Sequence, residues 1–351
     1  MDQSYDIHKS YDENYTAGPL LNGLSLDIPL SPLKEFLGKK VHSRIGIAAG
    51  LLLNSHWIGA YADLGFDLLT YKTVRSSYRP CYPVPNWVFV SDDGQLDGPI
   101  YVRDQIPSDL SKVSSAVCFG MPSMSPDVWR NDVTVAKGRL SPGQLLVVSV
   151  VATPEEGWGA EEIADDFARC AVWAADAGAD VIEANLSCPN VCTAEGSIYL
   201  DPNFSHRVAE KVRARIKQIP LLLKIGYFDH VDQLGLFLKT VAPVIDGVTL
   251  VNGITRPVLH KDGRPAFGES YIQAGVLGRS IHRASLDSVA RARRTVDEED
   301  LDLAILAVGG ASLVEDIETF FHAGANAVML GSSPMYHPRL ARDAKLHCAA
   351  W

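Results

Sequence analysis

Residues 181–190, Val-Ile-Glu-Ala-Asn-Leu-Ser-Cys-Pro-Asn, are the most informative stretch of this 351-residue chain. The apolar start predicts a strand, and Asn185 and Asn190 then bracket Cys188, which a proline follows directly. An asparagine amide offers both donors and an acceptor, which suits the edge of a planar, imide-like ligand. A thiol at the end of a strand can exchange a proton with such a ligand. The alternative is a buried structural cysteine in a strand-end turn.

On both sides of this strand, short apolar runs alternate with longer helical patterns, which is typical of βα units and a parallel sheet. The runs are almost wholly apolar, as expected for a sheet that is buried on both faces. An α/β fold, a (β/α)8 TIM barrel, is the economical prediction, because its loops converge on one face. The eight strands are predicted near residues 45, 68, 145, 181, 221, 247, 303 and 327.

Some segments break this alternation. Residues 75–143 are rich in proline and are predicted to form a long insertion between the second and third barrel strands. This insertion is expected to consist of long loops with a small excursion from the barrel. Residues from about 269 to 297 are predicted to form one long charged helix. We therefore expect an N-terminal extension that packs on the barrel (1–40), the barrel itself (41–340) and a C-terminal tail (341–351).

The composition excludes several classes of function. With 47% hydrophobic and 21% charged residues the chain is globular, and a net charge of −10 disfavours nucleic acid as a partner. Six scattered cysteines indicate a reduced, cytoplasmic protein, and no cysteine or histidine cluster predicts a metal site. The N-terminus does not read as a signal peptide, and no apolar run is long enough to span a membrane, so a membrane partner is not expected.

The informative polar residues lie at the carboxyl ends of the predicted strands, where a barrel builds its site. A lysine after an apolar strand is costly to bury unless it meets a charge or a ligand. Taken alone, Lys72 or Lys224 could equally be a lysine that reaches solvent at the rim of the barrel. Two lysines in one layer with asparagine amides, however, favour a ligand that all of them contact. The layer comprises Gly50, Lys72, Ser149, Asn185, Cys188, Lys224 and Asn252.

Two glycine-containing loops follow the last two strands, Gly309-Gly310 and Gly331-Ser332. Glycines let backbone N–H groups approach a phosphate, and helix starts favour anions. Many barrels bind a phosphate at this place whatever their chemistry. These loops therefore predict a phosphate-bearing ligand or cofactor.

Over about residues 40–340 the chain resembles the dihydroorotate dehydrogenase family, and residues 185–190 are also similar to the pyrimidine-reducing domain of dihydropyrimidine dehydrogenase. The motifs that carry this resemblance, in family order, are Ile45-Gly-Ile-Ala-Ala-Gly50, Tyr71-Lys72-Thr73, Asn185-Leu-Ser-Cys-Pro-Asn190, Leu222-Leu-Lys224-Ile, Val251-Asn252, Val308-Gly-Gly310 and Leu330-Gly-Ser332.

The resemblance implies an FMN-dependent oxidoreductase that acts on the CH–CH group of dihydroorotate or a related dihydropyrimidine or cyclic imide. Cys188 is then the base that takes the proton from carbon 5 while hydride leaves carbon 6, and Lys72 and Lys224 lie beside the flavin ring. The implied substrate-binding residues are Asn185, Asn190, Asn252, Gly120 and Met121. The implied FMN-binding residues are Ala49, Gly50, Lys72, Thr73, Ser149, Asn185, Lys224, Val251, Gly278, Gly309, Gly310, Gly331 and Ser332.

Three positions depart from the family pattern on the substrate side. Val117 stands where soluble members carry an asparagine that binds the orotate ring. Gly253 replaces the usual serine or threonine, and Asn86 replaces an arginine. An unpaired polar atom on the substrate would cost about 1–3 kcal/mol, so the flavin half of the predicted site is better supported than the orotate half.

Two alternatives stay open on the sequence. One is a phosphate-binding barrel lyase or isomerase with Lys72 or Lys224 as a Schiff-base lysine. The other is a flavin-binding barrel without orotate turnover, which the three departures favour and Cys188 and the lysines oppose. No nucleotide-binding Gly-x-Gly-x-x-Gly motif or cysteine cluster identifies the electron acceptor, and soluble relatives make a homodimer the expectation.

Overall fold

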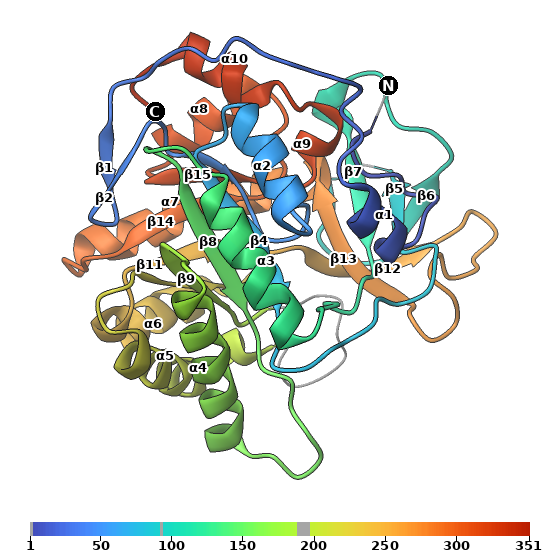
Figure 1. Cartoon of the computed structure of the whole chain (residues 1–351). Coiled ribbons are helices and arrows are strands. Elements are labelled where there is room, and N and C mark those ends of the chain that lie inside the picture. Colours follow the sequence, from blue (N-terminus) through green and yellow to red (C-terminus); the bar gives the residue numbers. More distant parts are fainter. Residues whose placement is uncertain (1–2, 92–93, 188–196) are drawn as a thin grey trace.

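Eight parallel strands close into a barrel in the computed structural model, which describes residues 3–91, 94–187 and 197–351 (Figure 1). The strand order is β10-β11-β14-β15-β3-β4-β8-β9, which closes on itself. This confirms the predicted (β/α)8 barrel, and every predicted strand is found. The strands are β3 (Ile45–Ile47), β4 (Leu68–Val74), β8 (Leu145–Val150), β9 (Val181–Asn185), β10 (Leu221–Lys224), β11 (Gly247–Leu250), β14 (Ala304–Val308) and β15 (Ala327–Leu330).

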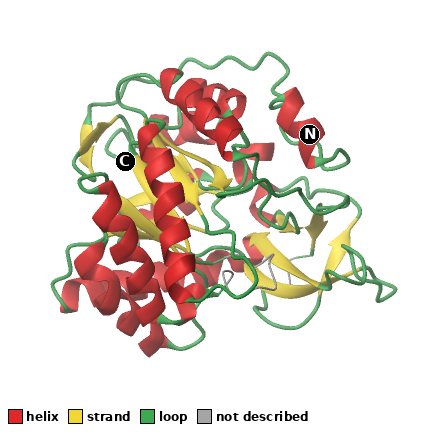
Figure 2. Cartoon of the chain, turned by 60° about the horizontal axis from the view of Figure 1, so that its bottom comes forward, coloured by secondary structure: helices red, strands yellow, loops and turns green. Residues whose placement is uncertain are grey.

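A ring of helices covers the outside of this barrel (Figure 2). Their apolar residues recur at helical spacing, as in α4, where Ile163, Phe167 and Ala171 are all buried. Asp201 caps α5 by accepting from the N–H groups of Asn203 and Phe204. The helices are α2 (Ser55–Asp63), α3 (Pro126–Gly138), α4 (Ala160–Asp176), α5 (Pro202–Ile216), α6 (Val231–Val241), α7 (Arg279–Glu298) and α8 (Val314–His322).

A second, smaller closed barrel lies beside the first, in the order β12-β13-β7-β5-β6 (Figure 2). Its strands come from two separate places in the chain, so the predicted insertion after β4 accounts for only three of them. Residues 75–143 also contain α3, where Pro126 lies at the first helical position, a site that tolerates proline. The strands are β5 (Trp87–Val90), β6 (Ile100–Arg103), β7 (Ser114–Val117), β12 (Ile254–Leu259) and β13 (Gln273–Gly278).

The prediction of one helix over residues 269–297 is wrong at its start. Residues Gln273–Gly278 form strand β13, which pairs with both β12 and β7, and α7 begins only at Arg279. Gly278 makes the turn between them with φ +86°, and a Cβ there would lie 2.5 Å from the carbonyl oxygen of Val113. This close approach and the left-handed backbone explain why the strand ends at a glycine.

Short helices and strands near both ends of the chain pack on the barrel. The short helix α1 (Tyr11–Ala17) begins with a complete Ser10–Glu13 capping box. The hairpin of β1 (Lys34–Phe36) and β2 (Lys39–Val41) buries Phe36 and Val41 in an apolar cluster with residues of the barrel strands. Helices α9 (Ser333–Tyr336) and α10 (Leu340–His347) follow the last strand. Among the described residues, no helix has the length and apolar content needed to cross a membrane.

A buried ion pair joins α10 to the start of β4. Lys345 Nζ lies 2.7 Å from Asp67 Oδ2, and the two side chains are 4% and 2% exposed. Ser43 Oγ donates to the same oxygen at 2.5 Å. Because both charges are removed from water, each depends on the other to offset its desolvation.

We predict that Lys345→Met lowers the free energy of unfolding by about 3–5 kcal/mol, because it leaves the Asp67 carboxylate buried without its counter-charge. Urea unfolding followed by circular dichroism measures this. The matched control is Lys40→Met, whose partner Glu35 lies 3.6 Å away in a pair with both side chains largely exposed, so a change of at most about 1 kcal/mol is expected. Equal effects of the two substitutions would contradict the role of the buried pair.

Candidate functional site

A cavity with about 990 Å³ of empty space, part of it open to solvent, lies at the carboxyl ends of the barrel strands. This size suits a cofactor or a ligand with its substrate. Most of the predicted site residues line it together, although they come from nine separate strand ends and loops. These are Ala49, Gly50, Lys72, Thr73, Met121, Asn185, Lys224, Val251, Asn252, Gly278, Gly309, Gly310, Gly331 and Ser332.

Two described residues that were predicted for the site, Ser149 and Gly120, are not among those that line the cavity. Ser149 is fully buried behind Thr73, and their hydroxyl oxygens lie 3.0 Å apart. Gly120 packs under Tyr82, whose ring a Cβ at that position would meet at 2.5 Å. Cys188 and Asn190 lie outside the described residues.

Two buried ammonium groups border the cavity. Lys72 and Lys224 are only 6% and 3% exposed. Lys224 Nζ donates to the carbonyl oxygen of Ala49 at 3.3 Å. The Lys72 ammonium lies 5.4 Å from the ring centroid of Phe119 and 5.7 Å from that of Tyr11. No aspartate or glutamate is among the described residues that line the cavity, so it is locally positive within an acidic protein and favours an anionic ligand.

The two amides hold the residue that precedes Cys188. The side-chain oxygen of Asn185 accepts from the Ser187 N–H at 3.2 Å, and the Asn252 amide donates to the Ser187 carbonyl. Asn185 Nδ2 also donates to Thr73 Oγ1 at 3.4 Å. Ser187 is therefore fixed on both sides of its backbone, at the point where the chain leaves β9.

Glycines shape the part of the cavity wall that follows β14 and β15. Gly309 and Gly310 have φ values of +137° and +75°, and a Cβ on them would lie 1.9 Å from Ser285 Oγ and 2.4 Å from the Gly278 carbonyl oxygen. Around Gly331, by contrast, a Cβ would meet nothing within 4 Å. The Gly331 loop thus presents bare backbone to open space, which fits the phosphate of a nucleotide cofactor such as FMN, whereas Gly309 and Gly310 are required by close packing behind the wall.

A histidine supports the first of these loops. His282 Nδ1 lies 3.1 Å from the Gly309 carbonyl oxygen and donates to it in the corresponding tautomer. Burial lowers the pKa of His282, although Asp316, 3.4 Å from Nε2, acts in the opposite direction. The His282 ring therefore ties the loop to α7 by a hydrogen bond.

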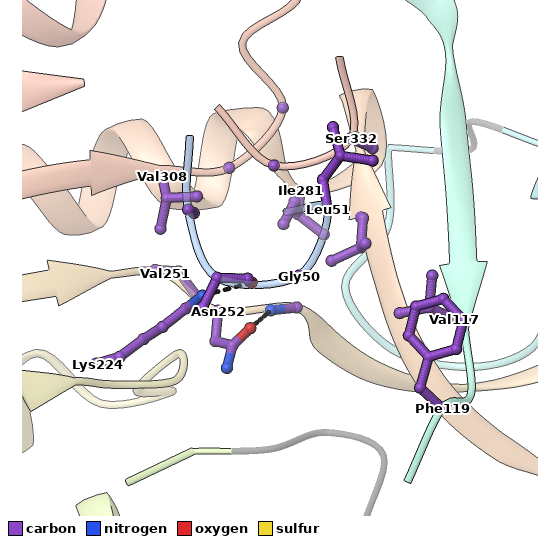
Figure 3. A pocket seen from close by; sticks show the side chains of 18 of the residues that line it. Gly50, Leu51, Val117, Phe119, Lys224, Val251, Asn252, Ile281, Val308 and Ser332 are labelled. Carbon is purple, nitrogen blue, oxygen red and sulfur yellow. Dashed lines mark hydrogen bonds between the residues drawn. The ribbon is translucent and has the colours of Figure 1, made fainter. Parts of the chain in front are cut away.

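One side of the cavity is apolar. Figure 3 shows Val117 and Phe119 together, on the side away from Lys224 and Asn252. Val117 and Gly253, two of the departures from the family pattern, both line the cavity, whereas Asn86 is buried and its amide donates to Cys81 Sγ at 3.6 Å.

Several lining residues were not predicted from the sequence. Tyr336 follows the Gly331-Ser332 loop closely enough for that motif to have indicated it. The others belong to apolar runs or to the second barrel and carry no polar signal. The unpredicted residues include Leu51, Trp87, Phe119, Leu277, Ile281, Val308, Ala311 and Tyr336.

Comparison with known proteins agrees with this geometry. The family model of Dihydroorotate dehydrogenase matches residues 140–343. A Dihydroorotate dehydrogenase of Dictyostelium discoideum is 33% identical over 96% of this chain and 95% of its own length. A Dihydroorotate dehydrogenase A (fumarate) of Limosilactobacillus reuteri is 29% identical over 48% of this chain and 53% of its own length.

The fold agrees as well. The crystal structure of DHODH in complex with ferulenol from Eimeria tenella superimposes with a TM-score of 0.70, covering 91% of this chain and 85% of that one at 18% identity. The full-length relative and the family match, which covers more than half of the chain, establish the kinship. The chain belongs to the dihydroorotate dehydrogenase family, whose members are oxidoreductases that act on CH–CH groups.

Proposed function

We propose that this protein oxidises dihydroorotate to orotate, with FMN as its resident cofactor and Cys188 as the base. The observation that carries the proposal is the single cavity that combines two buried ammonium groups with glycine loops, in a chain of this family. The electron acceptor is left open. A cytoplasmic homodimer is part of the proposal by resemblance to soluble relatives.

The described residues suit FMN. Gly309, Gly310, Gly331 and Ser332 would hold the phosphate, and Lys72 and Lys224 would lie by the ring system. Bound FMN supplies the acceptor for the hydride that leaves carbon 6 of the substrate. The remaining residues proposed to contact FMN are Ala49, Gly50, Thr73, Asn185, Val251 and Gly278, while Ser149 would act from behind Thr73.

The chain's own chemistry in this reaction is proton transfer and alignment. The Cys188 thiolate would take the proton from carbon 5, and a positive environment favours the thiolate form. Asn185 and Asn252 fix Ser187 and would thereby position the base that follows it. Both amides, together with Asn190 and Met121, would also contact the substrate. Lys224 would stabilise negative charge that develops on the cofactor.

A related dihydropyrimidine without a carboxylate is the second candidate substrate. Val117 and Gly253 line the cavity where a polar group would be expected for orotate. The Val117 side chain itself offers no hydrogen-bond partner to a polar or charged substituent that faces it, which disfavours such a substituent at that point of the cavity. Comparing kcat/KM for dihydroorotate and dihydrouracil separates the two candidates.

We predict that Gly331→Ala leaves the fold stable but weakens FMN binding by about tenfold, since the new methyl group would enter open space reserved for the cofactor. Thermal unfolding and FMN titration of the apoprotein measure the two effects. Gly138→Ala is the control, because a Cβ there also meets nothing within 4 Å but lies at the end of α3. Unchanged FMN affinity in Gly331→Ala would argue against the phosphate position.

We predict that Cys188→Ala retains FMN but slows dihydroorotate oxidation by about 10²–10⁴-fold, the usual contribution of a positioned base. The rate is measured with an artificial electron acceptor, with Cys192→Ala, four positions further along the sequence, as the control. An unchanged rate in Cys188→Ala would show that another group is the base.

We predict that Val117→Asn raises the preference for dihydroorotate over dihydrouracil by about tenfold, because the amide would pair with a polar atom of the larger substrate. The ratio of the two kcat/KM values is the measurement. A ratio that does not change would remove Val117 from the determinants of specificity.

A further inference from the structure

The N-terminal segment, residues 3–17, reaches the cavity wall, although its sequence shows no catalytic motif. It is tied down by two hydrogen bonds to neighbouring carbonyls of α1. The amide of Asn54 donates to the Tyr15 carbonyl at 2.7 Å, and Trp57 Nε1 donates to the Asn14 carbonyl at 3.3 Å. In Figure 1, α1 lies in front of the second barrel, and the ring of Tyr5 contacts Trp87 of that barrel with centroids 5.4 Å apart.

Tyr11, the first residue of α1, faces Lys72. Its ring centroid lies 5.7 Å from the Lys72 ammonium, and Phe119 faces the same ammonium at 5.4 Å. All three side chains are about 5–6% exposed. A desolvated ammonium between two ring faces is attracted to both, and this attraction is stronger than at an exposed site.

The rings that face Lys72 are themselves held in place. Tyr5, Trp87 and Phe119 pack mutually, with centroid distances of 5.4, 6.0 and 5.9 Å. Tyr11 and Phe119 meet edge to face at 6.1 Å. Because Trp87 and Phe119 also line the cavity, the N-terminal segment backs the wall from which Lys72 projects.

The same segment also contacts helix α9, which follows β15. The Ser4 N–H donates to the Met335 carbonyl at 2.8 Å. The Tyr61 hydroxyl donates its proton to the Pro334 carbonyl at 2.9 Å, so the Ser4 hydroxyl, 2.6 Å away, donates to Tyr61. Pro334 and Met335 belong to α9, directly after Gly331-Ser332. The segment therefore links the lysine wall to the predicted phosphate loop.

We infer that Tyr11 is a positioning residue of the redox site: its ring fixes the Lys72 ammonium at the place where the flavin ring is proposed to lie. The inference rests on the proposed FMN site and assigns a functional contact to the N-terminal segment. Loss of the ring would let the ammonium move away and would weaken stabilisation of the more negative, reduced cofactor.

Tyr11→Met tests the inference, since methionine fills much of the space without an aromatic face. We expect the midpoint potential of bound FMN to become more negative, by the amount that corresponds to about tenfold weaker binding of the reduced relative to the oxidised form. We expect kcat for dihydroorotate to fall by a similar factor, with less effect on KM. Tyr11→Phe, which keeps the ring, should retain the wild-type potential.

Two controls separate positioning from loosening of the segment. Ser10→Ala removes the capping box of α1 and keeps Tyr11, so it should lower the melting temperature more than it shifts the potential. In a Lys72→Met background, Tyr11→Met should cause no further shift, because its target is gone. This second comparison also holds if Tyr11→Met is less stable than the wild type.

The inference is overturned if Tyr11→Met leaves the potential unchanged, if Tyr11→Phe shifts it equally, or if the effect persists without Lys72. Its failure is distinct from failure of the proposed substrate, because the potential is measured without dihydroorotate. Wild-type protein that binds FMN but does not oxidise dihydroorotate would overturn only the substrate. Wild-type protein that binds no FMN would overturn both.

Discussion

The burial of two lysine side chains at one end of a parallel barrel is the constraint on which the site depends. An ammonium group in the protein interior is costly unless it meets carbonyls, rings or an anion. Lys224 meets the Ala49 carbonyl and Lys72 meets two aromatic rings. The cavity that both lysines border has glycine loops on its wall, and its local positive charge favours an anionic cofactor.

The strand ends deliver these groups because all eight strands run in the same direction. Residues that are far apart in sequence, such as Lys72, Asn185 and Asn252, thus reach one layer. The same geometry lets the amides of Asn185 and Asn252 hold Ser187 from both sides. The scaffold therefore fixes the chain at Ser187, the residue immediately before Cys188.

Much of the barrel could be predicted from the sequence, because runs such as Leu145–Val150 are apolar apart from one serine and recur between helical patterns. The second barrel could not, since β7 and β13 pair across more than 150 residues and neither has a local signal for its partner. The start of α7 was misplaced because residues 273–278 pack as a strand, a tertiary effect that overrides the charged pattern around them.

The polar part of the site was predictable for a related reason. A lysine or an amide is conspicuous at the end of an apolar strand, as Lys224 and Asn185 illustrate. Apolar lining residues such as Trp87 and Phe119 are not distinguished from core residues by sequence, and Tyr11 reaches the site only through the path of the N-terminal segment. The visible spectrum of the purified protein, recorded anaerobically before and after addition of dihydroorotate, tests the account most directly. The account predicts a flavin band that bleaches on mixing. Absence of a flavin band even after FMN is added would contradict it.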